Sequence, residues 1–205
     1  MGREDITLRD ALTEHRSTNG FAPDGGVQDR WAVFRLGPVA FCTPNLGVRR
    51  RAMFRHDLNH VVSGYGHDLR GEAEVSAWEL GSGCQRYLAA WVLAWSAIVA
   101  GIVLAPGRVF AAFVRGRRTT NLFGADLDSV LDRPLGAVRG MLGLNRPYRA
   151  RPADLLLFVL VVALGPLVGA IPVGLSILTS PVWLAQGAQR ARRGADAVSV
   201  PRGAS

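Results

Sequence analysis

The chain contains no lysine, so all 24 of its basic residues are arginine. Together with abundant alanine and glycine, this bias is typical of a GC-rich bacterial genome and carries no chemical information. Cysteine is also scarce, because only Cys42 and Cys84 occur and they lie far apart in the sequence. No hydrophobic segment of the secretory type follows Met1, so we expect no signal peptide and a reducing compartment.

Charged residues make up only 20% of the chain, against 49% hydrophobic residues, and the mean hydropathy is +0.17. The net charge of +8 suits an anionic partner, either nucleic acid or a membrane surface. No nucleic-acid-binding motif is present, whereas residues 87–107 and 155–178 are two long stretches without charge. We therefore expect a membrane, and no nucleic acid, as a partner.

Hydrophobic spacing and the positions of glycine and proline predict a mainly α fold, with a single helical domain and a C-terminal membrane-associated apolar segment. The expected helices cover residues 5–18, 47–63, 71–80, 108–118 and 125–142, the last broken near Pro134. Residues 31–36 could form a short strand or a helical turn. The expected organisation is a helical domain (1–145), a linker (146–153), an apolar membrane-associated segment (154–189) and a disordered basic tail (190–205).

Two histidines, His56 and His60, lie four residues apart in the stretch HDLNH, within an expected helix. On a helix such residues share one face, so their imidazoles can bind one metal ion. Glu72 follows after eleven further residues, and intervening glycines let the chain turn back and bring it over the pair. Asp57 lies about 100° around the helix and could be a ligand or orient a histidine. Without a metal, the histidines would cap the helix or face water.

Two histidines with one or two carboxylates suit zinc, with iron or magnesium as alternatives. An open position on the ion would support Lewis-acid or water-activation chemistry rather than a purely structural role. Glu79 could accept a hydrogen bond from a histidine ring or pair with an arginine. His67 could be an extra ligand, but we expect a solvent-facing loop histidine. Arg55 could help to bind an anion, but we expect it to be solvated.

The spacing of His56, Asp57, His60 and Glu72 resembles the HDxxH-x11-E signature of the coenzyme-Q-biosynthesis "Coq four" family. Flanking residues also fit that family: Pro44-Asn45, Arg49-Arg50, Gly64-Tyr65, Gly71, Arg115-Gly116-Arg117, Pro134-Leu135, Arg139 and Leu142-Gly143-Leu144. The resemblance extends over residues 8–144, and it leaves the second apolar stretch uncovered.

The resemblance implies an all-helical fold that binds prenyl lipids and coordinates a divalent ion through His56, Asp57, His60 and Glu72. It also implies oxidative decarboxylation at ring carbon one of a prenylated 4-hydroxybenzoate precursor, with the ion stabilising charge as the carboxyl group leaves. The expected partners are a prenylated aromatic or quinone lipid and other quinone-biosynthesis proteins or a second copy of the chain. The expected location is the cytoplasmic face of a bacterial inner membrane.

The two apolar stretches carry different expectations. A stripe of small residues from Ala90 to Gly101 predicts a core helix that lines a lipid tunnel. The second stretch is long enough as a helix to cross a bilayer, although Pro166 and Pro172 would kink it. It could therefore be a spanning helix or a kinked hairpin that enters one leaflet, and arginines on both sides of the stretch fit the hairpin better. The alternative without a membrane is a soluble pair of helices packed on the domain.

Two other functions are compatible with the sequence. A non-enzymatic scaffold could bind lipid and collect quinone-biosynthesis enzymes, with the ion stabilising its fold. A metal-dependent phosphohydrolase could also use adjacent His-Asp ligands, and it would need an upstream histidine such as His15. It would further need a distant aspartate, for which Asp126, Asp128 or Asp132 is available. The short spacing to Glu72 disfavours this class.

Overall fold

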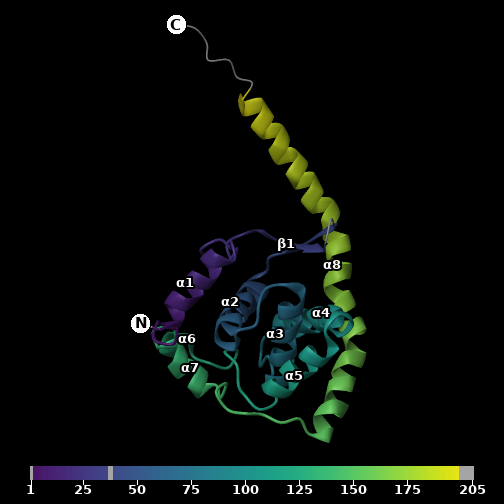
Figure 1. The fold of residues 1–205 in the computed structure, drawn as a ribbon. Helices are drawn as coiled ribbons and strands as arrows, with labels where there is room; N and C mark the ends of the chain where they lie inside the picture. Colours follow the sequence, from purple (N-terminus) through teal and green to yellow (C-terminus); the bar gives the residue numbers. More distant parts are fainter. Residues whose placement is uncertain (1, 37–38, 199–205) are drawn as a thin grey trace.

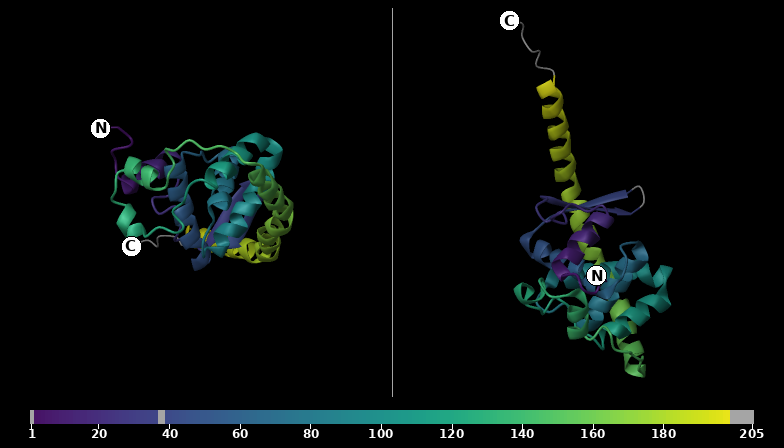
Figure 2. Two further views of the ribbon diagram at one scale, coloured as in Figure 1. Left: turned by 90° about the horizontal axis from the view of Figure 1, so that it is seen from below. Right: turned by 60° about the vertical axis from the view of Figure 1, so that its left-hand side comes forward.

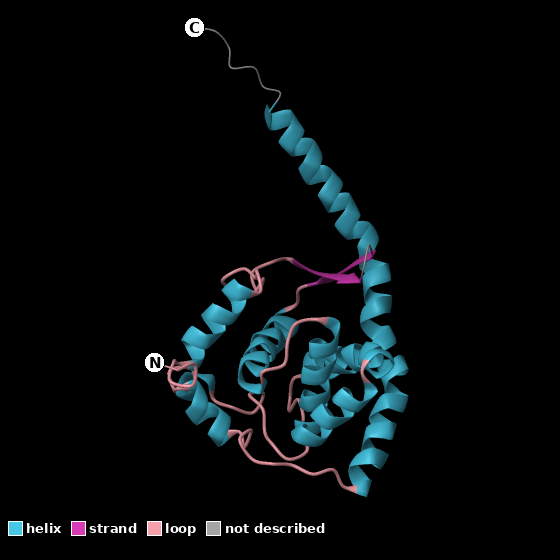
Figure 3. Ribbon diagram, viewed as in Figure 1, coloured by secondary structure: helices cyan, strands magenta, loops and turns pink. Residues whose placement is uncertain are grey.

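The computed structural model describes residues 2–36 and 39–198 and confirms a mainly helical fold with one long apolar C-terminal helix (Figures 1 and 3). The helices are α1 (Leu8–Thr18), α2 (Gly47–Ser63), α3 (Leu69–Ser82), α4 (Leu88–Leu104), α5 (Pro106–Gly116), α6 (Leu127–Val130), α7 (Leu135–Met141) and α8 (Pro152–Val198). The strands β1 (Trp31–Leu36) and β2 (Val39–Pro44) pair antiparallel in a hairpin. Residues 31–36 therefore form a strand, one of the two expected alternatives.

Helix α1 closes one side of the core. Thr7 caps this helix, because its side-chain oxygen accepts the Asp10 N–H at 3.1 Å and satisfies a donor that the first turn leaves free. Leu8 and Leu12 on the inner face are buried, and the helix packs against α2 and α7. His15 follows Leu8 by seven residues, so it lies on the same inner face.

A short connection, residues 64–68, joins α2 to α3. Helix α2 ends where Gly64 takes a left-handed conformation (φ 80°), which glycine adopts without steric cost. Asp68 caps α3 by accepting the Gly71 N–H at 2.9 Å. A Cβ at Gly71 would lie 2.3 Å from the backbone oxygen of Gly66, so the connection folds tightly onto α3. The tight connection thereby places the first turn of α3 beside the last turns of α2.

Helix α3 lies at the centre of the hydrophobic core, packed against α4 and α5. Its Trp78 is fully buried and donates the indole N–H to Thr119 Oγ1 at 2.8 Å. Gly101 allows α4 to approach α3 closely, because a Cβ at Gly101 would lie 2.2 Å from the Ala73 Cβ. The predicted core helix is therefore present, but α3 and not a lipid fills its small-residue stripe at this point.

Helix α8 runs along one side of the domain and continues beyond it (Figures 1 and 2). It is one continuous helix through Pro166, Pro172 and Pro181, so the expected re-entrant hairpin is wrong. Each proline removes a backbone donor and crowds the preceding turn. Packing against α4 and β2 holds the helix across these positions.

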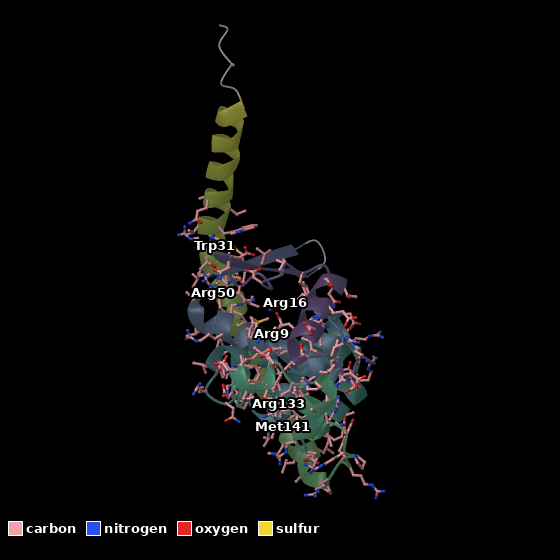
Figure 4. All side chains as sticks on the ribbon, turned by 90° about the vertical axis from the view of Figure 1, so that its left-hand side faces the viewer. Arg9, Arg16, Trp31, Arg50, Arg133 and Met141 are labelled. Carbon is pink, nitrogen blue, oxygen red and sulfur yellow. The ribbon has the colours of Figure 1, made fainter. Side chains whose placement is uncertain are left out.

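Contacts along α8 attach it to the domain over most of its described length. The Trp95 indole of α4 donates to the Val161 carbonyl at 3.0 Å, and Thr179 donates its hydroxyl to a β2 carbonyl at 3.0 Å. Further along, Trp31 of β1 donates to the Gln186 side chain at 3.1 Å, and Trp31 lies beside α8 in Figure 4. The helix is thus attached to the domain as far as Gln186.

Among the described residues, Pro152–Gln186 is the one helix long and apolar enough to cross a membrane. Its most apolar window has a mean hydropathy of 2.6, and only 11% of that window is buried. The outer face exposes large apolar side chains, among them Leu156, Leu160, Leu167, Ile171 and Leu178. The helical backbone reaches Val198, so residues 190–198 of the expected disordered tail are helical, and 199–205 lie outside the described residues.

Ion pairs fix the first turn of α8. Asp154 is only 1% exposed, accepts the Arg151 N–H at 2.8 Å and forms ion pairs with Arg118 and with Arg117. Residues 147–151, which precede the helix, have no regular secondary structure. The Asp154 carboxylate is therefore the point at which this irregular segment is joined to the domain.

Replacing Asp154 by asparagine should lower the free energy of unfolding by about 2 kcal/mol, because the largely buried Arg118 loses its charged partner. Thermal unfolding of the full chain in detergent measures the effect. The exposed Asp128 offers the matched control Asp128→Asn, which should leave Tm unchanged. Equal Tm values for the two variants would contradict the anchoring role of Asp154.

Candidate metal centre

The predicted ligand pair lies on one face of α2, and Glu72 reaches it from the first turn of α3. The Nε2 atoms of His56 and His60 are 3.1 Å apart. Glu72 Oε2 lies 3.3 Å from His56 Nε2, and Glu72 Oε1 lies 3.4 Å from His60 Nε2. These three side chains thus present one ligand atom each within 4.8 Å of one another, as a shared cation requires.

The outer nitrogens of the two rings are held by other groups. His56 donates its Nδ1–H to Glu79 Oε1 at 2.9 Å, and His60 donates its Nδ1–H to the Tyr65 carbonyl at 3.1 Å. Glu79 is itself 1% exposed and accepts a second hydrogen bond from Asn59 Nδ2 at 2.8 Å. Metal-binding histidines are typically oriented in this way by a carboxylate or carbonyl. Of the two alternatives for Glu79, the structure shows the hydrogen bond to a histidine.

This orientation leaves three acceptor groups facing one another. With both Nδ1 atoms protonated, the Nε2 lone pairs of His56 and His60 point at each other and at the Glu72 carboxylate. Ligand bonds of about 2.0–2.2 Å to zinc place the donors of a tetrahedron about 3.3–3.6 Å apart. The observed separations of 3.1, 3.3 and 3.4 Å lie in or just below that range, so the residues present fit a divalent ion.

The cluster stabilises positive charge. Burial lowers the pKa of His60, which favours its neutral form. Burial also opposes charge on His56, but the Glu79 and Glu72 carboxylates outweigh it and raise the pKa of His56 well above its ordinary value. Burial would likewise raise the pKa of Glu72, yet the rings of His56, His60 and His67, which donate to its carboxylate when a proton is on the facing nitrogen, hold it well below the usual range. Either a proton on His56 or a metal ion would supply the positive charge that the Glu72 and Glu79 carboxylates favour.

The cluster is closed on one side and open on the other. The His60 side chain is fully buried and that of His56 is 14% exposed, whereas the Glu72 side chain is 35% exposed. A ligand could therefore approach the ion from the Glu72 side. Sites that perform chemistry keep such an open position, whereas structural sites are closed by protein ligands.

The structure places Asp57, the fourth predicted ligand, away from the cluster. Its Oδ2 accepts a hydrogen bond from Arg16 Nη2 of α1 at 2.8 Å, and the two side chains are only 17% and 7% exposed. Arg16, labelled in Figure 4, also donates to the Pro23 carbonyl at 2.9 Å. Since Asp57 is about 100° around α2 from His56, its side chain points toward α1.

Two further histidines complete the cluster, which thereby contains all four histidines of the chain. His67 Nδ1 lies 3.0 Å from Glu72 Oε1, and the Nε2 atoms of His67 and His15 are in contact. The His67 side chain is 14% exposed, so the expectation of a solvent-facing loop histidine is wrong. Burial and the neighbouring His67 lower the pKa of His15 to about 4. In the sequence, His15 is a candidate ligand only for the phosphohydrolase alternative, and its spacing from Leu8 places it on the inner face of α1.

Other candidate residues have structural roles. Arg55 donates to the Tyr87 hydroxyl at 2.6 Å and to the Leu122 and Ala125 carbonyls, so it holds the segment before α6 and is not simply solvated. Asp132, a candidate for the phosphohydrolase site, forms an exposed ion pair with Arg9. Asp126 and Asp128 are exposed. Only the histidine of that alternative, His15, therefore lies at the cluster.

Comparison with known proteins adds no assignment to this geometry. No protein-family profile, no curated protein sequence and no solved structure matches the chain.

Replacing Gly71 by alanine should disturb the cluster without removing a ligand. Because the new Cβ would lie 2.3 Å from the Gly66 carbonyl oxygen, residues 64–68 must shift, and they carry both Tyr65 and His67. We expect zinc affinity, measured by titration calorimetry, to fall about tenfold or more. Gly124→Ala is the control, since its nearest neighbour would be 3.6 Å away. Equal zinc affinity in both variants would show that the cluster does not depend on this close approach.

Proposed function

We propose that this protein binds a divalent metal ion through His56, His60 and Glu72 and acts on a prenylated aromatic or quinone precursor at a membrane. The observation that carries the proposal is the convergence of three acceptor atoms within 4.8 Å, two of them on oriented imidazoles. The identity of the substrate comes from the resemblance of this motif to the Coq four family. Zinc is the proposed ion, with iron or magnesium as alternatives, and the cytoplasmic face of a bacterial inner membrane is the proposed location.

The reaction that the resemblance implies is oxidative decarboxylation at ring carbon one, in which dioxygen is the oxidant, the carboxyl group leaves as carbon dioxide, and the ring becomes a quinone with release of water. A bound divalent ion would supply Lewis acidity that stabilises negative charge on the substrate carboxyl group. The protein contributes orientation and charge: Glu79 fixes the ring of His56, the Tyr65 carbonyl fixes the ring of His60, and Glu72 remains anionic. The partial exposure of Glu72 leaves room for a carboxylated ring on that side.

An apolar groove supports the lipid part of the proposal. It has a volume of about 470 Å³ and lies between α2, α4, β2 and α8, with Leu88, Val92, Leu93, Ile171, Pro172 and Leu175 among its lining residues. Arg49, Arg51 and Arg86 also line the groove. An amphiphile with an anionic head and an isoprenoid tail matches this combination of apolar wall and basic residues.

One residue that lines the groove, Arg49, lies on the face of α2 that carries the metal centre. Arg49 precedes His56 by seven residues, which places the two on the same side of the helix about 10 Å apart along its axis. A prenylated acid could therefore lie along α2 with its tail in the groove. The partly exposed outer face of α8 supports contact with a lipid bilayer next to the same groove.

His56→Ala should abolish both metal content and turnover, because it removes a ligand and leaves the buried Glu79 carboxylate without its hydrogen bond from a histidine ring. Metal content is measured by elemental analysis of purified protein, and turnover by mass spectrometry of a prenylated 4-hydroxybenzoate with metal and oxygen. Glu14→Ala, which removes an exposed carboxylate on α1, is the control. Full metal occupancy in His56→Ala would refute the ligand assignment.

The same assay separates the enzyme from the scaffold. Wild-type protein that binds the prenylated acid and metal but never converts the acid would favour a lipid-binding scaffold for quinone-biosynthesis enzymes. Conversion that depends on His56 would favour the enzyme. The scaffold also predicts that His56→Ala lowers Tm more than Glu14→Ala does, because the ion would then serve mainly to stabilise the fold.

Membrane attachment through α8 has its own test. Leu160 and Leu167 are 53% and 73% exposed on α8, so Leu160→Glu with Leu167→Glu should weaken vesicle binding at least tenfold, as a charge enters hydrocarbon poorly. Flotation with phosphatidylcholine–phosphatidylglycerol vesicles measures the binding. Leu69→Glu, at an equally exposed position on α3 (52%), is the control. Unchanged flotation of the double variant would contradict attachment through this face.

A further inference from the structure

We propose that His67, and not Asp57, is the fourth protein ligand of the divalent ion, so that three imidazoles and one carboxylate form the donor set and a substrate would bind as a fifth ligand on the exposed side of Glu72. This inference rests on the metal site proposed above. It adds a ligand that lies outside the HDxxH-x11-E spacing, and it removes one that this spacing includes.

His67 lies next to the three residues whose ligand atoms fall within 4.8 Å of one another, and its ring would have to turn to join them. Its Nδ1 is 3.0 Å from Glu72 Oε1, and the same oxygen is 3.4 Å from His60 Nε2. The rings of His60 and His67 lie nearly face to face, with centroids 3.9 Å apart and planes at 30°. The ring of His67 therefore occupies the space beside His60 on the carboxylate side of the cluster.

The two nitrogens of His67 repeat the arrangement of the other two ligand rings. In His56 and His60 one nitrogen faces Glu72 and the other is held by a separate group. In His67 the Nδ1 faces Glu72, and the Nε2 contacts His15 of α1. A ring whose outer nitrogen is already tied presents its inner nitrogen in a defined direction, as metal-ligating histidines do. If His67 donates its Nε2–H to His15, then His15 orients the ring of His67 in the way that Glu79 orients the ring of His56.

Asp57 neither lies next to the ligand atoms nor directs a carboxylate oxygen toward them. Its Oδ2 is held by Arg16 at 2.8 Å in a largely buried ion pair. Turning this carboxylate toward the metal would leave the Arg16 guanidinium, 7% exposed, without its charged partner, which is strongly unfavourable. The ion pair therefore commits Asp57 to joining α1 to α2.

The chain around His67 permits a small adjustment onto an ion. His67 belongs to the connection 64–68, which contains Gly64 in a left-handed conformation and Gly66. The edge of Phe21 packs against the ring, with centroids 4.9 Å apart at 84°. Phe21 thus limits where the His67 ring can move, while Gly66, directly before it, lets the backbone adjust.

Cobalt(II) bound to the full chain tests the assignment. X-ray absorption counts the imidazoles on cobalt, and titration calorimetry with cobalt gives the affinity. We expect three imidazoles in the wild type and two in His67→Gly, with an affinity loss of more than about 100-fold, beyond that typical of losing an outer hydrogen-bonding partner. Free imidazole should enter the space left in His67→Gly and restore the third imidazole and the optical spectrum.

Asp57→Asn is the matched variant. It should keep the wild-type cobalt spectrum and affinity while lowering Tm, because only the pair with Arg16 is lost. A count of two imidazoles in the wild type would overturn the inference while leaving the metal site in place. The same holds if the cobalt spectrum changes in Asp57→Asn but does not change in His67→Gly. His67→Gln, which can still hydrogen-bond Glu72, provides a second test if the glycine variant does not fold. A wild type that binds no metal would overturn the proposed function and the inference together.

Discussion

The mutual repulsion of acceptor groups around Glu72 is the constraint on which the functional part of this fold depends. Two imidazole lone pairs and a carboxylate face one another at 3.1–3.4 Å, which is unfavourable unless a positive charge lies between them. The surrounding structure keeps them there. Glu79 and the Tyr65 carbonyl fix the rings, and the packing of α3 around Trp78 fixes the helix that carries the carboxylate.

The parts of the fold that follow from local rules could be predicted. Helix α2 has the predicted bounds, since Gly64 ends it in a conformation that favours glycine. The turn-forming glycines between α2 and α3 also correctly implied that Glu72 returns to His56 and His60. The seven-residue step from Glu72 to Glu79 placed the latter on the cluster side of α3. Periodicity and glycine chemistry were sufficient for these features.

The remaining features depend on partners that are distant in sequence. Whether Asp57 turns to the cluster or away from it is decided by Arg16, forty-one residues earlier, and no local pattern contains that choice. His67 is drawn inward by His15 and Glu72, although its loop position suggested exposure. Pro166 and Pro172 predicted kinks, and the flanking arginines favoured a hairpin, because local rules do not include the support that α4 and β2 provide to α8.

The attachment of α8 sets how the protein can move relative to a bilayer. Asp154 fastens the beginning of the helix to the domain, and Trp31 fastens it near Gln186. A domain tethered by a loose linker samples many heights and tilts above a surface. Here α8 is fixed to the domain that carries the cluster, so under the membrane attachment proposed above the cluster would keep a constant height and angle. The proposed lipid substrate would then reach it by lateral diffusion within the leaflet.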